Sequence, residues 1–157
     1  MRIAVLVTGQ VKTGHPLGDI VKNNKRMKEI FSDADFYYGT WDNFKGEFEK
    51  NFPKEKCYYF QEPKVHYHPY IDVPEDAHIS PHFTARVAWA KNLNNEKKIW
   101  TSHHSKQMLI HCMLLDKLKK EYDVIVRTRF DAFIHRKANF TPYIKDAYET
   151  GTAHGFA

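Results

Sequence analysis

Short apolar runs alternate along the chain with longer segments whose apolar residues recur at helical spacing. The apolar and aromatic runs predict strands at Ile3–Val7, Phe36–Trp41, Cys57–Phe60 and Asp123–Arg129. The helical spacing predicts amphipathic helices over residues 16–31, 43–55, 81–98 and 102–120. This alternation indicates an α/β fold with a mostly parallel central sheet flanked by helices.

Two of these segments have stronger patterns that predict burial. Val124, Ile125 and Val126 are consecutive β-branched residues, which predicts a strand covered on both faces. The helix over 102–120 is apolar almost all round, so we expect it to be deeply buried, with Cys112 in its core stripe.

Other segments carry weaker signals. Four prolines between Glu62 and Pro81 predict irregular structure there, followed by a helix that begins at Ser80-Pro81. Ala132–His135 predicts one more short strand, and residues 137–157 are weakly patterned. A length of 157 residues predicts one domain, over 1–157.

Composition and charge narrow the classes of partner. The formal net charge of +5 and a pI near 9.1 suit anionic ligands such as nucleotides or phosphates. No block of five like charges and no basic pattern interleaved with aromatics occurs, so we expect no specific nucleic-acid binding.

Cysteine content and the first residues bear on location. The two cysteines form no C-x-x-C motif, which favours a reducing compartment. The apolar stretch after Arg2 is too short for a signal peptide or a membrane span. We therefore expect a cytoplasmic protein with no membrane span.

Polar residues gather where three predicted strands end. These ends carry Thr8–Lys12, Thr40–Asp42 and Arg127–Asp131. The carboxyl ends of parallel strands meet at one edge of a sheet, where open α/β folds bind ligands. A glycine turn, cationic side chains and a strand-end aspartate can together hold a nucleoside diphosphate. The alternative interpretation is a structural ion pair between Arg129 and Asp131, since positions i and i+2 share a strand face.

These motifs resemble a family of GT-A-type glycosyltransferases of phages, large viruses and bacterial surface-polysaccharide clusters. In that family a first strand leads into a Gly-Gln-x-Arg-like turn, matched by Gly9–Lys12, and a second ends in Thr-Trp-Asp, matched by Thr40–Asp42. A helix with a glutamine, matched by Gln107, then precedes a Tyr-Asp…Arg-x-Arg-x-Asp strand, matched by Tyr122–Asp131. The resemblance covers residues 1 to about 135.

The resemblance implies a GT-A-like, Rossmann-like nucleotide-binding fold that transfers a sugar from a nucleotide-diphosphate donor to a glycan acceptor. It places Asp131 where such enzymes bind Mn²⁺ or Mg²⁺, and together with the strand-end residues it leads us to expect Asp131 and Arg129 as catalytic residues. The residues expected to bind the donor are Thr8, Gly9, Gln10, Lys12, Thr40, Trp41, Asp42, Gln107 and Arg127.

Two features depart from the family pattern. The acidic motif is a single aspartate and not Asp-x-Asp, so Arg127 or Arg129 is an alternative source of the positive charge. The chain also ends soon after the motif, and we expect it to lack much of the acceptor-binding half. The alternative function is therefore a non-catalytic nucleotide- or anion-binding module.

Overall fold

The structure is a computed structural model that describes residues 1–14, 19–62, 103–118, 120–135 and 138–154. The chain divides into two compact units, one formed by Met1–Glu62 with Gln107–Ala157 and the other by Pro63–Lys106. The first unit contains the sheet and all of the predicted site residues. The predicted helix over 81–98 and most of the proline-rich segment lie outside the described residues.

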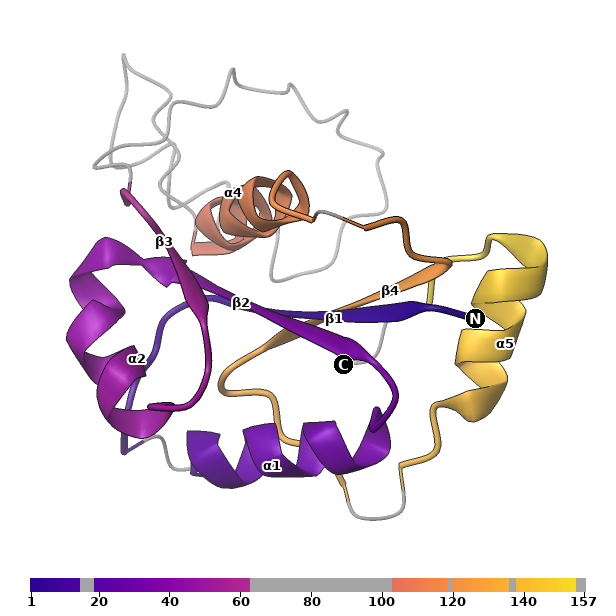
Figure 1. The fold of residues 1–157 in the computed structure, drawn as a ribbon, viewed down its shortest axis with the longest axis horizontal. Helices are drawn as coiled ribbons and strands as arrows, with labels where there is room; N and C mark the ends of the chain where they lie inside the picture. The colour runs from indigo at the N-terminus through magenta and orange to yellow at the C-terminus, as the bar shows by residue number, and fades with distance from the viewer. Residues whose placement is uncertain (15–18, 63–102, 119, 136–137, 155–157) are drawn as a thin grey trace, which may run out of the picture. The chain divides into compact units, whose positions relative to one another are not determined.

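Four strands form one sheet in the order β3-β2-β1-β4. Their bounds are Ile3–Thr8 for β1, Asp35–Trp41 for β2, Cys57–Phe60 for β3 and Val124–Arg129 for β4. Every neighbouring pair is parallel (Figure 1). The predicted α/β class with a parallel sheet is thus confirmed. β1 is central, which explains why Ala4–Val7 is apolar throughout and buried on both faces.

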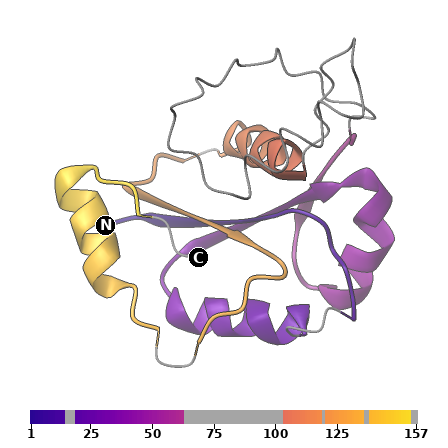
Figure 2. The same cartoon turned by 180° about the vertical axis from the view of Figure 1, so that it is seen from behind.

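Helices cover both faces of this sheet. On one face α1 (Ile20–Ile30) and α2 (Lys45–Asn51) pack against Val5, Val7 and Tyr38. On the other face α4 (His103–Leu115) packs against Leu6, Trp41 and Phe60 (Figures 1 and 2). α4 approaches β2 closely at Gly39, where a Cβ would lie 3.2 Å from Leu114 Cδ2.

An aromatic cluster fixes the end of β4 beneath the sheet. The Tyr38 ring lies within 6.3 Å, centroid to centroid, of Phe48, Phe52 and Phe130. The Tyr38 hydroxyl donates to Asn24 Oδ1 at 2.9 Å, and burial raises the Tyr38 pKa. Because Phe130 directly follows β4, its buried ring anchors the charged residues on either side of it.

Several predicted helix bounds are wrong. α1 begins at Ile20 and not at 16, because Asp19 is extended and caps the helix by accepting from Val21 N at 2.9 Å. The helix expected over 43–55 is a 3-10 turn, η1 (Asp42–Phe44), followed by α2. No helix in the described part of the chain is long and apolar enough to cross a membrane.

Among the α4 side chains that the structure describes, burial is uneven, whereas the sequence predicted a deeply buried helix that is apolar almost all round. α4 ends at Leu115, five residues early, and Ile110 and Leu114 are fully buried. Cys112, expected in the core, is exposed. A sheet covers only one stripe of a helix, so apolar residues elsewhere on α4 are not buried by it.

The prediction that both faces of β4 are covered is also wrong. β4 is an edge strand, and Ile125 is 44% exposed, on the same face as Arg127 and Arg129. The β-branched run indicates a strand, but strand order decides whether helices cover it.

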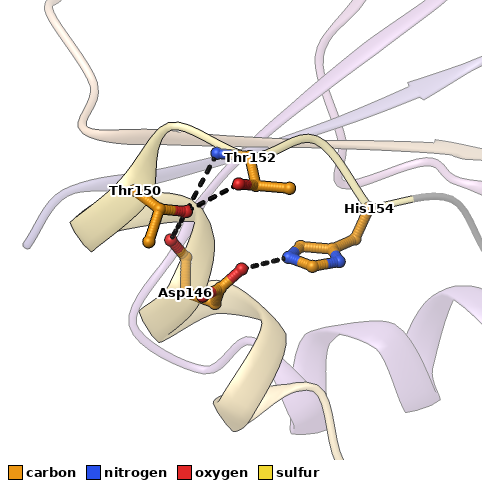
Figure 3. Close-up of polar contacts among 4 residues, drawn as sticks. All are labelled: Asp146, Thr150, Thr152 and His154. Carbon is orange, nitrogen blue, oxygen red and sulfur yellow. Dashed lines mark hydrogen bonds and ion pairs between the residues drawn. The ribbon is translucent and has the colours of Figure 1, made fainter.

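The region after β4 differs from both expectations made for it. Ala132–His135 forms no strand. The weakly patterned tail contains α5 (Thr141–Thr150), which contacts β4. Pro142 lies in its first turn, and Gly151 ends it with φ at 70°. After α5 the chain folds back, so that His154 Nε2 lies 2.7 Å from Asp146 Oδ2 and Thr152 contacts Thr150 (Figure 3).

Candidate functional site

The strand order places the predicted site residues at a topological switch point. From β1 the chain proceeds to β2 and β3 on one side, and β4 lies on the other side of β1. The strand register sets Thr8 opposite both Gly39 and Arg129. The carboxyl ends of β1 and β4 are therefore neighbours, in the position where doubly wound sheets bind ligands.

The turn after β1 is held by the end of β2. Gly9 has φ at 121°, a conformation that side chains disfavour. Its N–H donates to the Gly39 carbonyl at 3.3 Å, and its own carbonyl accepts from the Thr40 hydroxyl at 2.7 Å. Thr40 is fully buried and Thr8 is nearly so. The Thr40 hydroxyl thus holds the turn, which Thr8 enters from the end of β1.

The turn then leads to the surface. Gln10 is half-buried, Val11 returns to the core and Lys12 is exposed. Because Val11 is buried, it anchors the turn between Gln10 and Lys12. The predicted role of these residues in donor binding stays a prediction.

Arg129 and Asp131 form a bidentate ion pair at the end of β4. Arg129 Nε donates to Asp131 Oδ1 at 2.8 Å, and Nη2 donates to Oδ2 at 2.6 Å. Nη1 lies 3.5 Å from Gln107 Oε1 on α4, a long contact. Three of the predicted site residues are thus in contact. The Arg129–Asp131 ion pair that the alternative interpretation expected is therefore present. An anion-binding role for Arg129 stays a prediction.

Arg127 lies two residues before Arg129, on the same face of β4, and is close enough to His111 of α4 to affect its pKa. Burial lowers the pKa of His111, and the positive charge of Arg127 lowers it further. His111 is 9% exposed, and its Nδ1 is buried with no hydrogen-bond partner among the described residues. Gln107 and His111 are one helical turn apart, so α4 presents two polar residues toward the two β4 arginines.

Sequence reasoning missed His111. The residue stands inside an apolar run and resembles a core position. The signal that was available is its i, i+4 spacing from Gln107, which puts both residues on one face of a helix.

The end of β2 is divided between core and surface. Trp41 is 2% exposed and packs with Leu6 and the α4 residues Ile110 and Leu114. Asp42 is exposed and opens η1. In this arrangement Asp42 is available to a ligand, whereas Trp41 supports the edge from within the core.

The donor atoms near Asp131 do not fit a divalent cation as they stand. Both carboxylate oxygens of Asp131 accept N–H groups from Arg129. Across the described ranges, no three His, Cys, Asp or Glu side chains gather where they can share a metal ion. Mg²⁺ and Mn²⁺ favour several oxygen ligands, and a single carboxylate that already accepts two N–H groups supplies only part of such a set. Metal binding at Asp131 stays a prediction drawn from the resemblance.

A surface groove of about 420 Å³ lies elsewhere, between α1 and the segment Asn51–Glu55. None of the predicted site residues lines it. Its charged residues occur with both signs, and Lys28 and Glu55 pair directly across it. Its three lysines are offset by two glutamates, and one of these lysines is paired with one of the glutamates.

Comparisons of the chain with protein-family models, with curated proteins and with solved structures give no match. A function for this protein is therefore inferred from the geometry of the carboxyl edge.

Proposed function

We propose that the protein is a glycosyltransferase that binds a nucleotide-diphosphate sugar at the carboxyl edge of β1 and β4 and transfers the sugar to a glycan acceptor. The observation that carries the proposal is the meeting of the Gly9 turn with the Arg127–Asp131 strand end at the switch point. The Gly9 turn lets backbone approach a ligand closely, and Lys12 and the arginines supply positive charge.

The same groups suit the chemistry of sugar transfer. As the glycosidic bond breaks, negative charge grows on the departing nucleoside diphosphate. Guanidinium and ammonium groups held beside that diphosphate stabilise the charge more in the transition state than in the ground state. Arg127, Arg129 and Lys12 take this role in the proposal, and Asp42 and Gln107 lie on adjoining elements of the edge.

A panel of UDP-, GDP- and CDP-sugars tests the proposal by thermal shift and by release of free nucleotide. A ligand at about 100 times its Kd adds about 2.7 kcal/mol to the free energy of unfolding, which is readily detected. We expect at least one donor to stabilise the protein and to be hydrolysed slowly. Absence of stabilisation by every donor contradicts the proposal.

A second function, a non-catalytic nucleotide- or anion-binding module, is favoured by one observation. Both carboxylate oxygens of Asp131 accept N–H groups from Arg129, so the described contacts show this carboxylate as the partner of an arginine. Stabilisation by a donor with no turnover in the presence of glycan acceptors supports this module. Cytoplasmic location, expected from the cysteine content, stays a prediction under either function.

A further inference from the structure

The Arg129 side chain is held in one orientation while part of it remains open to solvent. Asp131 engages Nε and Nη2 of the guanidinium. The Arg129 side chain is 48% exposed and that of Asp131 is 27% exposed. A guanidinium has five N–H groups, and Asp131 takes two of them. The long contact to Gln107 leaves Nη1 weakly engaged.

An exposed ion pair of this kind contributes little to stability. Solvent screens the charges of such pairs, and side-chain entropy opposes the pairing. Its structural effect is to fix the plane of the guanidinium, which has donors on more than one side and can meet phosphate oxygens with paired N–H groups.

The formal charge around this guanidinium also favours an anion. Lys12, Arg127 and Arg129 are exposed cations on the adjoining ends of β1 and β4, and Asp131 is the carboxylate that pairs with Arg129. With the exposed Asp42 after β2 counted as well, three formal positive charges meet two carboxylates, and the net positive charge of this edge favours a diphosphate. The buried Phe130 ring keeps Arg129 and Asp131 at fixed places on either side of it.

We infer that this edge binds a nucleoside diphosphate without a divalent cation, and that Asp131 is a positioning residue that acts through Arg129. The inference rests on the proposed function, since it specifies how the same site meets the charge of the donor. It assigns to a held arginine the role that the resemblance gives to a metal ion.

Calorimetric titration of UDP, GDP and CDP, in EDTA and in Mn²⁺, tests the cation part. We expect the nucleotide that binds to show a Kd in EDTA within about threefold of its Kd in Mn²⁺, a difference of about 0.65 kcal/mol. Binding that is lost in EDTA and restored by Mn²⁺ overturns the inference but leaves the proposed function intact. Binding of no nucleotide under either condition overturns both.

A double-mutant cycle in EDTA tests the positioning role of Asp131. Arg129→Ala removes a charge-assisted contact and should weaken nucleotide binding about 10- to 100-fold. Asp131→Asn should weaken nucleotide binding about 3- to 10-fold, because Arg129 loses the partner that orients it. If Asp131 acts through Arg129, the Asp131→Asn effect disappears in the Arg129→Ala background. An effect of equal size in both backgrounds overturns the positioning role.

A spectroscopic readout separates positioning from general structural damage. The Arg129 Nε–H signal in ¹H–¹⁵N NMR should exchange slowly in the wild type and broaden in Asp131→Asn, while Asp131→Glu should partly restore it. Asp146→Asn is the matched control, because Asp146 pairs with His154 after α5 (Figure 3), whereas Arg129 pairs with Asp131. A slowly exchanging Arg129 signal in Asp131→Asn contradicts the inference.

Discussion

At the amino end of the sheet, polar side chains are paired with one another across distant parts of the sequence. The Tyr122 hydroxyl donates to Asp35 Oδ2 at 2.7 Å, and Lys120 Nζ donates to the same oxygen at 3.1 Å. Asp123 Oδ2 accepts from Arg2 N at 2.6 Å, which joins the starts of β1 and β4. These bonds tie strands to the loop before β4.

At the carboxyl end of the same strands, three cationic side chains in the turn after β1 and on β4 meet the carboxylate of Asp131, and the exposed Asp42 after β2 adds a second carboxylate. Arg129 pairs with Asp131, and further cations are Arg127 on β4 and Lys12 in the turn after β1. At this end the Thr40 hydroxyl bonds the Gly9 backbone, whereas at the amino end carboxylate side chains make the bonds between strands. The amino end is therefore joined by bonds between strands, whereas the carboxyl ends of β1 and β4 carry the cationic side chains expected of an anion site.

The largest effect on nucleotide binding should come from removing both arginine charges of β4. Arg127→Ala combined with Arg129→Ala should weaken nucleotide binding at least about 100-fold, since each charge-assisted contact contributes about 1.5–3 kcal/mol. The free energy of unfolding should change far less, because both side chains are exposed. Calorimetry and urea denaturation measure the two effects. Arg2→Ala, which removes an exposed arginine at the amino end, is the control, and equal loss of affinity there contradicts the comparison.

The amino end should respond in the opposite way. Tyr122→Phe removes the hydroxyl that bonds Asp35 and contacts Tyr37, and should lower the free energy of unfolding by about 1 kcal/mol. Nucleotide affinity should be unchanged, since this end is remote from the ligand. Urea denaturation with and without nucleotide checks both statements. A variant that loses affinity but keeps its stability would reverse the assignment of the two ends.

A smaller effect should appear as a dependence of stability on pH. The pKa of His111 is lowered from its ordinary value of 6.5 by burial and by Arg127. The unfolded chain therefore binds a proton first as the pH falls below about 6.5, and this favours unfolding; above that pH the contribution to stability is fully present. His111→Gln should flatten the decline in unfolding free energy between about pH 7 and 5.5. Equal slopes for the two proteins would contradict the burial of a neutral imidazole.

The smallest effect should follow from changes at α5, which belongs to neither end. His154→Ala removes an exposed pairing with Asp146 and a ring contact with Tyr143. Stability should change by less than about 0.5 kcal/mol, and nucleotide affinity should not change. Thermal and chemical denaturation measure the first and calorimetry the second. A loss above about 1 kcal/mol would mean that the turn after α5 is part of the core.

The strands could be predicted from the sequence. In a central strand such as β1, no polar residue interrupts the apolar run. The place of β4 at the edge was not readable, since strand order arises from tertiary packing and β-branched residues occur in edge and central strands alike. α5 was missed although Pro142 and Gly151 bracket it, because the helix between them has no buried residue to strengthen the pattern.

The candidate site was predictable in part. Parallel strands carry their end residues to one edge, so the meeting of Thr8–Lys12 with Arg127–Asp131 followed from topology. Burial of Trp41 and Thr40 did not, because it depends on how α4 and the Gly9 turn pack on β2. The spacing of Arg129 and Asp131 indicated their ion pair, while the neighbouring His111 required knowledge of which α4 face meets β4.

The most direct test of the central claim is to map nucleotide binding onto the two ends of the sheet by ¹H–¹⁵N NMR in EDTA. We predict saturable shifts of backbone amides at Gly9–Lys12 and Arg127–Asp131, with Asp35 and Asp123 unchanged. Shifts confined to the amino end or to the groove beside α1, or no shifts with UDP, GDP or CDP, would contradict this claim.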